Sequence, residues 1–108
     1  MFVPAPLPLP RVAMLLVLLP PLPPAADAPA RAGRAVTLGR LRSLQQELGP
    51  AIHVLTIDAA THPAVVRSFD GRGLPAFVLV RDGVELWRQP GLPEGPAIAI
   101  RLLRKLAA

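Results

Sequence analysis

The chain has 108 residues, which is enough for one small domain with a single hydrophobic core. Its net charge is +5, but the basic residues are scattered singly and aromatic residues make up only 4%, so we expect a solvated basic surface and no nucleic-acid partner. The chain has no cysteine, which excludes disulfides, thiolate catalysis and Cys-ligated metals.

Nine of the fifteen prolines lie in the first thirty positions. Residues 1–11, MFVPAPLPLPR, alternate proline with apolar residues and predict a flexible, polyproline-like tail, followed by one domain over residues 12–108. The apolar run 12–19 is too short to span a bilayer. It is typical either of a strand buried on both faces or of the apolar core of a secretory signal, because small residues follow at 25–30.

The next segments predict a helix, a strand and a second, shorter helix. Leucines at positions 38, 41, 44 and 48 share one helical face, and Gly49-Pro50 is a typical stop, which predicts a helix over about 27–48. Residues 51–58, AIHVLTID, predict a second buried strand. The short helix after it has Thr61 as its expected N-cap and Pro63 in its first turn.

The last third of the chain predicts a strand hairpin and a closing helix. Residues 76–81 and 84–89 flank Asp82-Gly83, a strong hairpin signal, and a stripe of apolar residues predicts a helix from about Glu94 to the C-terminus. The resulting order is β-α-β-α-β-β-α. Strands separated by helices imply parallel pairing and the hairpin adds antiparallel strands, so we expect an α/β fold with a mixed sheet and helices on both faces.

Two segments, VLTIDAATHP and VVRSFDGRGLPAFVLVRDGVELWRQPG, resemble the thioredoxin family over roughly residues 51–106. The resemblance implies a thioredoxin-like sheet, in which the proline matching Pro75 is cis and forms one wall of a substrate groove. It also implies a central strand ahead of the first long helix, which favours the strand interpretation of residues 12–19. A cytoplasmic protein is then expected, and a secreted or periplasmic one is the alternative if residues 1–30 act as a signal.

The family's Trp-Cys-Gly-Pro-Cys motif falls, without gaps, on residues 34–38, so its two cysteine positions hold Ala35 and Leu38. Thiol–disulfide exchange needs one thiolate to attack and a second thiol to resolve, and both are absent. We therefore expect a redox-inactive protein with no catalytic residues and no cofactor. The alternative is a thiol–disulfide oxidoreductase relative that is degenerate, or whose active-site segment is lost or misread.

The resemblance implies a groove that binds a protein or an extended peptide. Its expected residues lie before the hairpin, after the hairpin and near residues 35–38, where the resemblance places the helix start; they are Leu74, Pro75, Gly91, Leu92, Val36 and Thr37.

Four other residues have an expected structural role. His53 and His62 stand without cysteine or clustered carboxylates, so they predict a core histidine and a surface histidine and no metal site. Asp58 is expected to end its strand and cap the next turn, and Trp87 to pack on a face of the hairpin.

Overall fold

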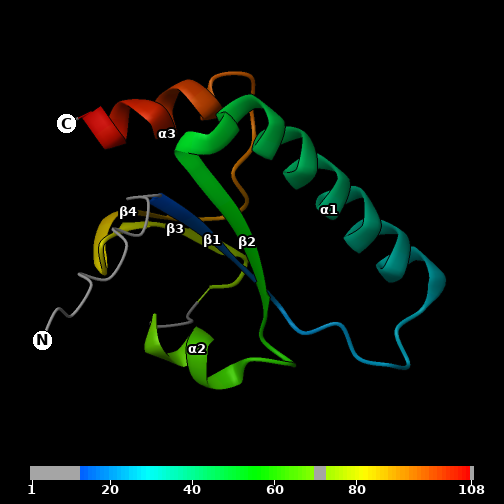
Figure 1. Ribbon diagram of the computed structural model, residues 1–108. Coiled ribbons are helices and arrows are strands. Elements are labelled where there is room, and N and C mark those ends of the chain that lie inside the picture. Colours follow the sequence, from blue (N-terminus) through cyan, green and yellow to red (C-terminus); the bar gives the residue numbers. More distant parts are fainter. Residues whose placement is uncertain (1–12, 70–72, 108) are drawn as a thin grey trace, which may run out of the picture.

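The computed structural model describes residues 13–69 and 73–107 of the chain. The predicted tail, residues 1–11, lies outside the described residues. The described part contains a four-stranded sheet and three α-helices (Figure 1). In chain order these are β1 (Ala13–Leu19), α1 (Ala28–Leu48), β2 (Ile52–Asp58), α2 (Pro63–Ser68), β3 (Ala76–Arg81), β4 (Val84–Pro90) and α3 (Ile98–Ala107).

The sheet has the order β2-β1-β3-β4, with β1 parallel to β2 and antiparallel to β3. Helices α1 and α3 cover one face of the sheet and α2 covers the other (Figure 1). The predicted α/β architecture and its element order are therefore confirmed. No helix among the described residues combines the length and the apolar character that a bilayer span requires.

Strand β1 is the centre of the core, which confirms the strand interpretation of its apolar run. Leu15 and Val17 point to the face that α1 and α3 cover, whereas Leu16 and Leu18 point to the α2 face. All four side chains are buried. Because a central strand must present apolar side chains on both faces, its sequence is an unbroken apolar run instead of an alternating one.

Helix α1 begins at Ala28 because Asp27 caps it: the Asp27 carboxylate accepts a hydrogen bond of 2.9 Å from the Ala30 N–H. Leu41, Leu44 and Leu48 are buried against the sheet, as the leucine spacing predicts. The helix stops at Gly49, whose φ of +60° lies in the left-handed region that glycine adopts readily.

Strand β2 differs from its prediction, because it is an outer strand and not a buried one. Only Ile52 and Ile57 of its residues are buried, and Leu55 is 39% exposed. His53 is exposed, so the expected core histidine is wrong. The reason is sheet order: β2 has β1 on one side and no strand among the described residues on the other.

Two helix starts also differ from their predictions. The N-cap of α2 is His62 instead of Thr61, whose hydroxyl donates instead to the Asp58 carbonyl at 3.3 Å. Pro63 occupies the first turn as expected. Helix α3 begins at Ile98 instead of Glu94, because the intervening Gly95 has a φ of +101°, which is incompatible with a right-handed helix.

The hairpin of β3 and β4 turns at Asp82 and Gly83, which have φ values of +54° and +77°. Two successive positive φ values are typical of the tight turn that the Asp-Gly pair predicts. Trp87 packs edge-to-face on Phe77, with ring centroids 5.5 Å apart, and the cations of Arg101 and Lys105 lie over its ring. The predicted packing role of Trp87 is therefore confirmed.

Candidate functional site

One end of the sheet gathers most of the residues that the resemblance singled out. The strand directions place the ends of β1, β2 and β4 and the start of β3 together there. The Gly91 N–H donates to the Pro75 carbonyl at 2.8 Å, so these two residues lie side by side. The Leu74–Pro75 peptide bond is cis. Gly91 has a φ of +92°, which L side chains rarely adopt, so a glycine suits this turn.

Leu74 combines a packed side chain with a backbone that has no hydrogen-bond partner in the described part of the chain. Its side chain packs against the core cluster on the α2 face. Strand β1 pairs with β3 only as far as Leu18 and Ala76. Within residues 13–69 and 73–107, no backbone group is hydrogen-bonded to the N–H or C=O of Leu74. The residue is thus anchored by its side chain, while residues 13–69 and 73–107 leave its main-chain groups unpaired.

Helix α1 borders this end of the sheet. Thr37 and Leu92 line the same small cavity, which places the loop after β4 against the helix. Val36, the preceding residue on α1, is 55% exposed. We call the set Val36, Thr37, Leu74, Pro75, Gly91 and Leu92 the sheet-end surface.

The two positions that match the family's cysteines do not lie at a helix start. Because Asp27 caps α1, the helix begins at Ala28, as the predicted range of 27–48 has it, and both positions lie inside it, which corrects the start near residues 35–38 that the resemblance implies. Ala35 is exposed. Leu38 packs against the core and lines a groove beside β2, so it does not form a floor for the sheet-end surface.

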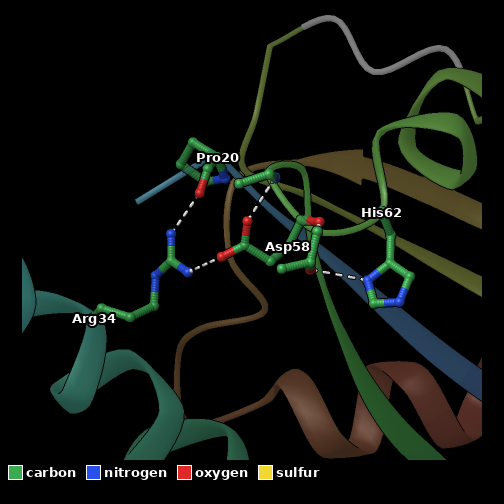
Figure 2. Close-up of polar contacts among 6 residues, drawn as sticks. Pro20, Arg34, Asp58 and His62 are labelled. Atoms are coloured by element: carbon green, nitrogen blue, oxygen red, sulfur yellow. Dashed lines mark hydrogen bonds and ion pairs between the residues drawn. The ribbon is translucent and has the colours of Figure 1, made fainter. Parts of the chain in front are cut away.

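An ion pair that the sequence analysis did not predict ties α1 to the same end of the sheet. The Arg34 guanidinium lies 2.8 Å from the Asp58 carboxylate and also donates to the Pro20 carbonyl (Figure 2). Both side chains are mostly buried, with exposures of 17% and 28%. Arg34 thus joins the ends of β1 and β2 to the helix. The sequence feature that points to this contact is the position of Arg34, which shares a helical face with the buried leucines of α1.

Asp58 ends β2 and caps the next turn, as predicted, by accepting a hydrogen bond of 2.6 Å from the Ala60 N–H. Burial alone would raise the pKa of the Asp58 carboxyl, but the Ala60 N–H and the Arg34 guanidinium outweigh burial and hold the pKa below its usual value. Asp58 therefore stabilises the fold as a carboxylate. The carboxylate makes its full contribution to stability at pH values above the pKa of Asp58 in the unfolded chain. The contribution disappears as the pH falls through the pKa of Asp58 in the folded protein.

We expect Asp58→Asn to be less stable than the wild type at neutral pH. The difference should narrow below about pH 4, where the unfolded carboxyl begins to bind a proton, and should fade at lower pH. Urea unfolding at a series of pH values measures this difference. Asp82→Asn is the matched control, because asparagine also tolerates the positive φ of that turn. A difference for Asp58→Asn that is constant with pH would contradict the role of this carboxylate.

The chemistry available at the sheet-end surface is that of main-chain groups and apolar side chains. The chain has no thiol, and the described residues contain no group of three or more side chains that could hold a metal ion. Leu74, Leu92 and Val36 offer apolar contact, and Leu74 offers a backbone donor and acceptor. Main-chain hydrogen bonds and apolar contacts are therefore the interactions that this surface can make.

No protein-family model matches the sequence, and no curated protein matches it. Solved structures do match the fold. Thioredoxin-2, a component of the malaria parasite protein secretion machinery, is 16% identical with a TM-score of 0.67 over 86% of this chain and 82% of that one. Fasciola hepatica thioredoxin is 16% identical with a TM-score of 0.64 over 88% and 82%. Chloroplastic thioredoxin z is 15% identical with a TM-score of 0.65 over 92% and 82%. The chain has a thioredoxin-like fold, as the resemblance predicts.

Proposed function

We propose that this chain is a redox-inactive protein of thioredoxin-like fold that binds an extended segment of another protein at the sheet-end surface. The observation that carries the proposal is the backbone of Leu74, which has no partner among the described residues. An extended peptide can pair with such groups by strand addition, in which main-chain hydrogen bonds give affinity and neighbouring side chains give selectivity.

The sequence explains why strand β1 does not pair with the backbone of Leu74. The antiparallel register of β1 and β3, continued beyond Ala76, sets Pro20 opposite Leu74. Proline has no N–H to donate. The carbonyl of Pro20 is already bound by the Arg34 guanidinium (Figure 2). The chain therefore does not extend the β1–β3 ladder to Leu74, and Arg34 acts as a positioning residue for the site.

The same contacts define the kind of partner that fits. After β4, the Gly91 N–H donates to the Pro75 carbonyl, so this carbonyl already has a partner. The main-chain groups that can pair with a peptide are then those of Leu74. Val36, an exposed side chain of α1, is apolar, and so is Leu92. A segment that is extended and carries apolar side chains next to its paired residue would match these groups. Because no thiol is present, capture is reversible, and its affinity is modest, since a short added strand buries little area and must first be ordered.

Peptides selected from a random library displayed on phage provide the test. We expect Leu74→Asp to weaken the binding of the selected peptides by about tenfold or more, or about 1.4 kcal/mol, because the charge lies beside the groups that pair with the peptide. Arg104→Asp, on the exposed face of α3 over the opposite end of the sheet, should change the affinity little (Figure 1). Isothermal titration of each variant gives the dissociation constants.

Because the side chain of Leu74 also packs in the core, a second pair of variants separates binding from folding. Val36 on α1 is 55% exposed and Ile100 on α3 is 54% exposed, so aspartate costs little stability at either position. We expect Val36→Asp to weaken peptide binding and Ile100→Asp to leave it unchanged. Equal losses from the two variants, or no loss from Val36→Asp and Leu74→Asp with the fold intact, would place the binding site elsewhere.

A further inference from the structure

Among the residues that the structure describes, one side chain of α1, that of Gln45, binds the outer edge of β2. The Gln45 carboxamide accepts a hydrogen bond of 2.7 Å from the Val54 N–H and donates one of 2.8 Å to the Ile52 carbonyl. It also donates to the Gly49 carbonyl at 3.2 Å. Gln45 is partly buried, whereas Gln46, the next residue on the helix, is exposed. One glutamine is thus bound to the strand while its neighbour faces solvent.

The two β2 groups that Gln45 binds are those that a further strand would use. In an extended strand, the N–H and C=O of alternate residues point to the same side. The Ala59 N–H, just beyond β2, donates to the Leu19 carbonyl of β1, so the odd-numbered positions face β1. Ile52 and Val54 therefore point outward. The Gln45 carboxamide, with its oxygen as the acceptor and one of its two N–H groups as the donor, takes the place of a neighbouring backbone.

The rest of this edge is open among the described residues. By the same alternation, the N–H and C=O of Thr56 point outward. A groove of about 430 Å³, lined by Leu38, Leu41, Arg42, Gln45, His53, Val54 and Thr56, runs between α1 and this edge. Leu55 adds an exposed apolar side chain on the same strand. An uncovered edge of this kind is a template for pairing with another chain.

We propose that Gln45 blocks the β2 edge and so prevents β2 from pairing with β2 of a second copy of this chain. The edge is self-complementary: when two copies meet antiparallel with Val54 on the two-fold axis, the two Val54 residues exchange two hydrogen bonds, and Ile52 of each copy faces Thr56 of the other. That arrangement needs the Val54 N–H and the Ile52 carbonyl, and Gln45 binds both. Removal of the carboxamide therefore frees the missing donor together with the Ile52 acceptor.

Sedimentation equilibrium of the full chain over a wide range of concentration tests the proposal. We expect the wild type and Gln46→Ala to remain monomeric. Gln45→Ala should self-associate, with an apparent mass that rises with concentration towards that of a dimer. Gln46→Ala is the matched control, because it removes the same side chain from the same helix at an exposed position.

A second variant distinguishes edge pairing from a loss of structure. The combined variant Gln45→Ala and Thr56→Pro removes the outward N–H that would donate to Ile52 of the copy, and proline is tolerated where a strand's N–H faces solvent. We expect this variant to be monomeric and folded by circular dichroism. The proposal is overturned if Gln45→Ala stays monomeric or simply unfolds, if Gln46→Ala associates equally, if Thr56→Pro fails to restore the monomer, or if the wild type is already a dimer.

Discussion

Phe77→Ala should lower the free energy of unfolding by about 3–5 kcal/mol, the usual cost of removing a buried aromatic side chain. Phe77 is 1% exposed and lies on β3 between the sheet and the helices α1 and α3. Its ring also makes the edge-to-face contact with Trp87. The variant thus loses apolar burial and an aromatic pair, and leaves a cavity where two layers of the fold meet.

Urea unfolding followed by circular dichroism measures this effect. Val84→Ala is the control, because Val84 is an apolar residue of the same hairpin that is 59% exposed. We expect it to change the free energy of unfolding by less than about 0.5 kcal/mol. Similar losses for the two variants would show that the core is not where the structure places it.

Leu102→Ala should cost about 2–5 kcal/mol, as is typical of buried leucine truncations. Leu102 is fully buried and fixes α3 to the core beneath α1. The helix is short, so its packing rather than its own propensity holds it in place. Differential scanning calorimetry should show a clear fall in the unfolding temperature of this variant.

Ile100→Ala on the same helix is the matched control for Leu102→Ala. Ile100 is 54% exposed, so its truncation removes little buried surface. We expect its unfolding temperature to stay close to that of the wild type. If Ile100→Ala destabilises the protein as much as Leu102→Ala, α3 presents a different face to the core.

The sequence predicts the core strands and helices of this protein well, for physical reasons. An apolar run closed by two prolines leaves few options other than a strand buried on both faces, and β1 is such a strand. Leucines at three- and four-residue steps predict the buried face of α1. Asp82-Gly83 predicts the hairpin because few other pairs adopt two positive φ values easily. In each case the local sequence contains the whole signal.

Features that depend on distant parts of the chain could not be predicted in the same way. The residues of β2 are mostly apolar, but whether they are buried depends on which strands flank them, and β2 is an outer strand. The ion pair of Arg34 and Asp58 joins residues that are far apart in the sequence. The position of Thr37 against Leu92 likewise follows from how α1 crosses the sheet.

The resemblance singled out the residues of the candidate site, but not how they are arranged. The resemblance to thioredoxins drew attention to the residues around Pro75 and Gly91, which the structure brings together through one hydrogen bond. It also led to a helix start near residue 35, whereas the cap at Asp27 starts α1 earlier. A family pattern places a site correctly only where the alignment to the family is correct. A local capping residue can start a helix at a different position from the one that the alignment implies.

Mapping the backbone amides that respond to a bound peptide tests the central claim most directly. Two-dimensional ¹H–¹⁵N spectra of the full chain should be recorded as a phage-selected peptide is added. We expect the largest shifts at the amides of Thr37, Leu74, Gly91 and Leu92, and none at the side-chain amide of Gln45 on the β2 edge. Shifts confined to β2 or to α3, with the amides of the sheet-end surface unchanged, would contradict the claim that this surface binds a peptide.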